Sequence, residues 1–224
     1  MNAWALIPLI SAITFAVLFA IVIQQARKEV DRRFVIFLFA SAIWSLVTFL
    51  MIYNPSVSEA YLKFWNSFVI AAIPLVAVSY YHFVRAYTGK STNWLVYLGY
   101  VFTAIILIAG FTGNVIKKAW MDHGRMFHDI APWDYIIAAG IVPFIVLTIA
   151  MLIRRYRSSK DPSDRNRTMY LIIGWAALVL ISYITPFTPD LRTLPTDHIK
   201  HPLNTIQWCG SLLDTNVDLV HYVF

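Results

Sequence analysis

Long apolar runs separated by short polar segments are the main pattern of this 224-residue sequence. A helix needs about 20 apolar residues to cross the roughly 30 Å hydrocarbon core of a bilayer. These runs do not alternate between apolar and polar residues, as the strands of a transmembrane barrel would. Because backbone amides in lipid must be hydrogen-bonded within their own segment or in a closed barrel, the runs predict transmembrane helices. The six predicted spans are residues 4–23, 34–53, 64–84, 94–116, 133–153 and 169–187.

The C-terminal segment, residues 202–224, carries a weaker pattern. Its apolar side chains recur at three- and four-residue steps, as on one face of a helix, but Asp214 and Asp218 lie in its second half. Three interpretations remain open: a seventh span packed against its neighbours, an interfacial amphipathic helix, or the damaged end of a longer protein. We favour the seventh span. The predicted fold is all-α, an integral membrane helical bundle of six clear transmembrane helices plus this seventh, in a single domain over residues 1–224.

Composition agrees with a membrane protein. Hydrophobic residues make up 59% of the chain and charged residues 13%, against about 25% charged residues in an average soluble domain. So little charge cannot cover a soluble surface. A single cysteine, Cys209, excludes an internal disulfide framework and a cysteine-based zinc site.

The distribution of basic residues predicts the topology. Segments after the first, third and fifth spans hold twelve Lys and Arg residues, and the opposite side holds six. The positive-inside rule therefore places the N-terminus outside and, with a seventh span, the C-terminus in the cytoplasm of a multi-pass plasma-membrane protein. This topology accounts for the net charge of +6. The lipid bilayer is accordingly a partner, with contact to anionic lipids, and nucleic acid is not.

Several sequence features follow one another in a characteristic order. Trp44 lies in the middle of the second span, Pro74 interrupts the third, and the sequence FVRAYTG at residues 83–89 ends it. Trp175 follows a glycine in the sixth span. In this order and spacing, over about residues 3–200, the chain resembles the N-terminal seven-transmembrane sensor region of bacterial and archaeal histidine kinases. The resemblance implies a sensory, signal-transducing module, a cytoplasmic kinase-like effector and a homodimer.

Two departures from that family bear on catalysis. Residues 198–207 are polar where the family has a clean apolar seventh helix, and the sequence stops at Phe224. We therefore expect no catalytic domain on this chain, with the effector on another chain or lost by truncation. No metalloprotease, nucleophile-elbow or phosphate-loop motif is present either, so the prediction is a non-enzyme without a cofactor.

Candidate ligand-binding residues are the tryptophans that lie away from the membrane interfaces. Trp44 and Trp175 sit well inside their spans, where each indole N–H needs a hydrogen-bond partner. They either pack in the bundle or line a pocket for a small apolar or aromatic ligand. Asn66 and Tyr183, nearer the outer half, are weaker candidates for the same pocket.

Histidines on the predicted outer side are candidate metal ligands. They are His123, His128, His198 and His201, which lie beside aspartates in the sequence. Such pairs are able to bind zinc or to sense external acidity, and solvated loop histidines without any role are the alternative interpretation.

Two further positions carry polar groups at span ends. His82 and Arg85, near the inner end of the third span, are expected to meet lipid phosphates or the next helix. Asp134 lies in the first turn of the fifth span, where a carboxylate suits the positive end of a helix.

Other functions remain as alternatives. A small transporter or channel subunit is the main one, although the six spans hold no ionisable group at mid-depth. A microbial rhodopsin has the same size and topology but needs a mid-span lysine, whereas Lys63 and Lys200 lie at helix starts. A role as a membrane-anchored assembly factor is a third alternative.

Overall fold

The computed structural model describes residues 5–53, 58–122, 125–130 and 132–184, and the side chains of residues 121–122, 125–127 and 178–184 are not described. The chain divides into two compact units, Met1–Met169 and Tyr170–Phe224, each considered by itself. Whether the chain behaves as a single domain stays a prediction. The helices of the described residues are α1 (Leu6–Gln25), α2 (Glu29–Tyr53), α3 (Glu59–Tyr87), α4 (Trp94–Phe111), α5 (Trp133–Ser158) and α6 (Pro162–Ile184).

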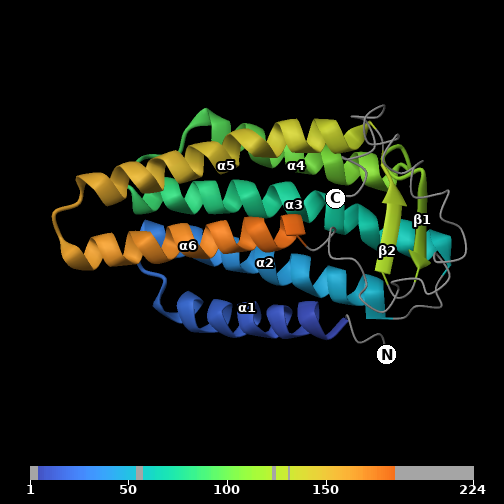
Figure 1. Ribbon diagram of the computed structural model, residues 1–224, viewed down its shortest axis with the longest axis horizontal. Coiled ribbons are helices and arrows are strands. Elements are labelled where there is room, and N and C mark those ends of the chain that lie inside the picture. The colour runs from blue at the N-terminus through green and yellow to red at the C-terminus, as the bar shows by residue number, and fades with distance from the viewer. Residues whose placement is uncertain (1–4, 54–57, 123–124, 131, 185–224) are drawn as a thin grey trace, which may run out of the picture. The chain divides into compact units, whose positions relative to one another are not determined.

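Helix α3 is the centre of the first unit. It packs against α2, α4 and α5, while α1 packs against α2 (Figure 1). Within the most apolar window of each helix, 78% of α3 is buried but only 6% of α1. The core is therefore built around α3, and the surrounding helices separate it from lipid.

Apolar side chains cover the outside of this bundle. Ile7 and Ile10 on α1, and Trp94 and Ile108 on α4, are each more than half exposed. Contiguous exposed apolar surface of this extent is typical of a membrane-facing protein. Five helices in the described part of the chain, α1 to α5, are long and apolar enough to cross a membrane.

These helices confirm the predicted membrane bundle for the first five spans. Helix α6 covers the first part of the sixth predicted span, whose remaining residues lie outside the described ranges, as does the predicted seventh span at 202–224. A count of six or seven spans therefore stays a prediction.

Several helix boundaries are set by capping residues and differ from the boundaries of the apolar runs. Helix α3 begins at Glu59, five residues before the apolar run, because Ser58 accepts a hydrogen bond from the backbone N–H of Tyr61 at 3.3 Å. It ends at Tyr87, where Thr88 is the C-cap and Gly89 follows with a φ of 73°, the left-handed conformation that glycine adopts readily. Helix α4 ends at Phe111, earlier than predicted, since Gly113 has the same conformation with a φ of 76°.

A β-hairpin lies between the fourth and fifth predicted spans. Strands β1 (Lys118–Asp122) and β2 (Arg125–Asp129) pair antiparallel, with Lys118 opposite Asp129 and Asp122 opposite Arg125. Lys118 and Asp129 carry opposite charges at one end of this register, which favours the pairing. Strand β1 contacts α3, so the hairpin packs at one end of the first unit (Figure 1). We call this the hairpin end.

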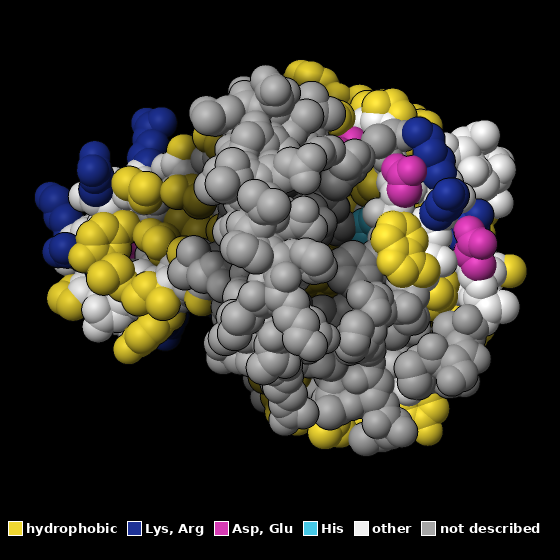
Figure 2. Space-filling view, turned by 45° about the vertical axis from the view of Figure 1, so that its right-hand side comes forward, with side chains coloured by type: hydrophobic (Ala, Val, Ile, Leu, Met, Phe, Trp, Pro, Cys, Tyr) yellow, Lys and Arg dark blue, Asp and Glu magenta, His cyan; other side chains and the backbone are white. Residues whose placement is uncertain are grey.

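The opposite end carries the short connections at residues 26–28, 88–93 and 159–161. Figure 2 shows Lys and Arg side chains gathered on its left-hand side, beside hydrophobic side chains. We call this the basic end. It is the end that the positive-inside rule assigns to the cytoplasm.

Candidate functional site

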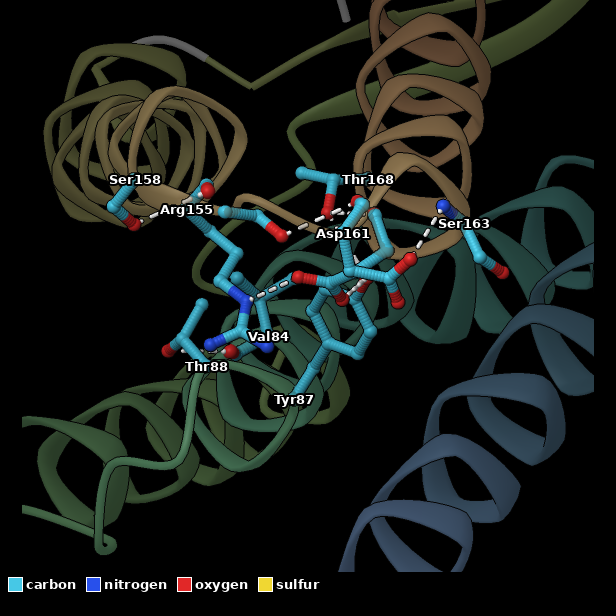
Figure 3. Close-up of polar contacts among 10 residues, drawn as sticks. Val84, Tyr87, Thr88, Arg155, Ser158, Asp161, Ser163 and Thr168 are labelled. Carbon is cyan, nitrogen blue, oxygen red and sulfur yellow. Dashed lines mark hydrogen bonds and ion pairs between the residues drawn. The ribbon is translucent and has the colours of Figure 1, made fainter.

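A cluster of hydrogen-bonded side chains joins three helices at the basic end (Figure 3). Tyr87, the last residue of α3, donates from its phenol to Oδ1 of Asp164 on α6 at 3.2 Å. The same phenol oxygen lies 2.9 Å from Oγ1 of Thr168, one turn further along α6. Thr168 is fully buried and donates to the carbonyl oxygen of Asp164 at 2.8 Å. Asp164 therefore ties the beginning of α6 to the end of α3.

The last turn of α5 contacts the other oxygen of this carboxylate. Nε of Arg155 donates to Oδ2 of Asp164 at 2.9 Å, and the two side chains are 42% and 18% exposed. A hydrogen bond from Ser159, followed by the hydrogen bond and charge of Arg155, lowers the pKa of the Asp164 carboxyl below its ordinary value, although partial burial opposes the shift. The carboxylate is thus held ionised between two helices. We call Tyr87, Arg155, Asp164 and Thr168 the basic-end cluster.

The local sequence explains why the cluster forms. Oδ1 of Asp161 accepts a hydrogen bond from the backbone N–H of Ser163 at 3.0 Å, which is an N-cap contact. Pro162 occupies the first helical position, where its missing N–H costs nothing. The resulting tight turn brings Asp164, in the first turn of α6, alongside Arg155, in the last turn of α5.

A second polar group fixes α3 to α4 at the same end. The buried ring of His82 lies with Nδ1 3.2 Å from the Tyr100 hydroxyl on α4 and with Nε2 3.1 Å from Oγ1 of Thr92. Arg85 donates from Nε to the Ser91 carbonyl at 2.9 Å. Of the two expectations for His82 and Arg85, contact with the next helix and its connection is the one observed.

The structure describes the side chains of three of the four predicted ligand-binding residues. Trp44 is half-buried on α2, and its carbonyl accepts a hydrogen bond from Thr48 at 2.8 Å. Trp175 is buried, but it belongs to the unit that begins at Tyr170. The side chain of Tyr183 lies outside the described residues. A pocket shared by these residues therefore stays a prediction.

Asn66 stands out among these candidates. Its side chain on α3 is fully buried, and neither the amide nitrogen nor the amide oxygen has a hydrogen-bond partner in the described part of the chain. Leaving a buried polar group unsatisfied costs about 1–3 kcal/mol.

Asp134 is also buried. Its Oδ1 accepts from the Tyr135 backbone N–H at 2.9 Å, whereas Oδ2 has no partner there.

The candidate metal ligands are not assembled in the described residues. His128 lies in β2 opposite Ala119. His123, His198 and His201 lie outside the described residues. Within the ranges that the structure describes, no three His, Cys, Asp or Glu residues form a group able to hold a metal ion. The metal site therefore stays a prediction.

Sequence reasoning missed the basic-end cluster. Tyr87 and Asp164 are 77 residues apart, and no local pattern links them. The one available signal was the pair Arg155 and Asp164, opposite charges nine residues apart, with Asp164 ending the Asp-Pro-Ser-Asp turn.

The fold and its polar cluster define a class: a helical membrane module with a buried central helix and linked helix ends. Comparison with known families gives the particular assignment. Residues 7–197 match the family described as the N-terminal 7TM region of histidine kinase, and the chain belongs to this family. No curated protein and no solved structure matches it. The resemblance seen in the sequence is thereby confirmed, and the chain is a sensory membrane module.

Proposed function

We propose that this chain receives a signal in or at the membrane and passes it, as a change in helix packing, to a cytoplasmic kinase-like effector. The observation that carries the proposal is the basic-end cluster, in which Tyr87, Arg155 and Asp164 join α3, α5 and α6. Family membership supports the sensory role.

The arrangement of α3 supports a relay through the bundle. Its N-terminal half packs beside the hairpin, and its C-terminal end bonds to α4 and α6. Packed helices shift between discrete arrangements and do not deform continuously. A stimulus that binds one arrangement better moves the population toward it. A shift of α3 would therefore change which partners Tyr87 and His82 meet at the basic end.

We propose further that this region performs no chemistry itself. The polar side chains of the cluster are engaged with one another and offer no nucleophile next to a free base. Catalysis is then supplied by an effector outside this region, and the homodimer implied by the family would bring two effectors together.

Accessibility of the basic end tests the direction of the relay. Ser159 lies in the turn between α5 and α6, so a Ser159→Cys variant with Cys209→Ser places one thiol there. We expect a membrane-impermeant maleimide to label this thiol in inverted vesicles and not in intact cells, with Thr112→Cys, at the hairpin end of α4, as the opposite control. Labelling of Ser159→Cys in intact cells would contradict transmission to the cytoplasm.

One observation favours the alternative of a small transporter or channel subunit. Asn66 on α3 and Thr148 on α5 are fully buried with side-chain atoms that lack partners in the described part of the chain, and a rearrangement that opened a pathway along these helices would hydrate them. Solute flux into liposomes carrying the purified protein separates the two functions. The sensory proposal predicts flux no greater than in protein-free liposomes.

A further inference from the structure

Two arginines on the exposed face of α5 have no partner in the part of the chain that the structure describes. Arg154 and Arg157 are exposed in the last turns of the helix, and neither forms an ion pair or side-chain hydrogen bond within the described residues. Together with Ala150, Ile153 and Ser158 they line a shallow groove. Guanidinium groups on adjacent turns present several donors toward the same space.

Two neighbouring arginines are engaged elsewhere. Arg155 bonds to Asp164. Arg165 lies over the ring of Tyr156, with 4.9 Å between its guanidinium carbon and the ring centroid. The groove therefore carries two positive charges that no described side chain compensates.

An apolar stripe leads from the membrane core to these charges. Val142, Val146, Ala150 and Ile153 follow one another at three- and four-residue steps along α5 and are exposed, so they share one face of the helix. The predicted fifth span ends at Ile153. Arg154 and Arg157 consequently lie at the depth where hydrocarbon gives way to headgroups.

We propose that this face of α5 is a binding site for an anionic phospholipid, whose phosphate lies on Arg154 and Arg157 and whose acyl chain lies along the apolar stripe. Arginine suits this role because its planar guanidinium contacts phosphate oxygens in a bidentate manner. The apolar stripe selects a lipid over a soluble phosphate. The site depends on the membrane assignment and is independent of signalling.

Native mass spectrometry of the detergent-solubilised full chain tests this site. The probes are dioleoyl phosphatidylglycerol, dioleoyl phosphatidylcholine and glycerol 1-phosphate. The test variant is Arg154→Gln/Arg157→Gln. The matched control is Arg165→Gln/Arg167→Gln, which removes two charges from exposed positions at the same end.

The unmodified chain should bind phosphatidylglycerol more tightly than phosphatidylcholine and should not retain glycerol 1-phosphate. Attraction of two basic residues to an anionic lipid corresponds to roughly thirtyfold in affinity. The test variant should lose about that much of its preference for phosphatidylglycerol over phosphatidylcholine, whereas the control should keep this preference. Ala150→Trp, which fills the groove without changing charge, should weaken the binding of both lipids.

Equal phosphatidylglycerol affinity in the test variant and the unmodified chain would overturn the proposal. Equal loss in the control would overturn it too, because the preference would then follow total charge. Retention of glycerol 1-phosphate as tight as that of the lipid would replace the lipid site by a phosphate site.

Discussion

Among the described residues of the first unit, buried polar side chains are hydrogen-bonded to one another at the basic end and lack partners in the half nearer the hairpin. At the basic end, Tyr87, Asp164 and Thr168 satisfy one another across α3 and α6. In the half of the bundle nearer the hairpin, Asn66 and one oxygen of Asp134 are buried with no partner among the described residues.

Hydrogen-bonded and unsatisfied buried polar groups contribute differently to the stability of the protein. A satisfied cluster specifies how the helices meet, and each member depends on the others. An unsatisfied group costs stability and implies another role, such as contact with a water or a ligand. We therefore expect substitutions at the two ends to change stability in opposite directions.

The largest effect is expected from Asp164→Ala. The change removes the acceptor for both Tyr87 and Arg155 and should lower the free energy of unfolding by about 2 kcal/mol, in the range of hydrogen bonds to charged groups. Reversible unfolding in mixed micelles measures this value. Glu29→Ala is the matched control, because its pair with Arg33 is exposed and worth a few tenths of a kcal/mol. Equal effects of the two changes would show that the cluster does not hold the helices.

Asn66→Leu should act in the opposite direction. Replacing an unsatisfied buried amide by an apolar side chain of similar size should raise the free energy of unfolding by about 1 kcal/mol, measured in the same assay. Ser67→Ala, beside it, removes a hydroxyl that donates to the Lys63 carbonyl and should not stabilise the protein. Destabilisation by Asn66→Leu would indicate that the amide already binds a structural group.

Tyr87→Phe isolates a single hydroxyl of the basic-end cluster. We expect a loss of about 1 kcal/mol in the free energy of unfolding, because the Asp164 and Thr168 contacts lose one partner while the ring stays. Tyr97→Phe on the exposed face of α4 is the control and should be neutral within about 0.5 kcal/mol. A neutral Tyr87→Phe would remove the link between α3 and α6.

The smallest effect is a dependence on acidity. The folded state lowers the pKa of Asp164 below its ordinary value. The ionised carboxylate therefore stabilises the fold at pH values above the ordinary pKa, and this stabilisation is lost as the pH falls through the lowered pKa. Thermal unfolding from neutral to acidic pH should show a smaller acid-induced decrease in Asp164→Asn than in the unmodified chain. Identical pH profiles would contradict the contribution of Asp164.

The apolar pattern was sufficient to predict where α1 to α5 lie, because lipid requires long helices of uniform polarity. It was insufficient for their ends. Helix α3 extends to Glu59 and Tyr87 through a Ser58 cap and a Thr88–Gly89 stop, which are local hydrogen-bonding features. The hairpin was missed because its strands are five residues each and do not alternate in polarity.

The candidate site was predicted least well, because long-range polar contacts leave no periodic signal. Tyr87 and Thr168 are 81 residues apart and meet only once α3 and α6 are placed. Asn66 was a weaker candidate for a pocket, chosen for its position nearer the outer half of the membrane. That its amide is buried without a partner in the described part of the chain follows from packing and not from sequence.

Kinase output in a chimera tests the central claim most directly. Residues 1–224 are joined to the cytoplasmic region of a histidine kinase that lacks its own input region, and autophosphorylation is measured in membrane vesicles. The account predicts that Tyr87→Phe and Asp164→Asn shift basal output in the same direction by several-fold, while Tyr97→Phe and Glu29→Gln leave it unchanged. Equal output from all five chimeras, with equal protein in the membrane, would contradict transmission through the basic-end cluster.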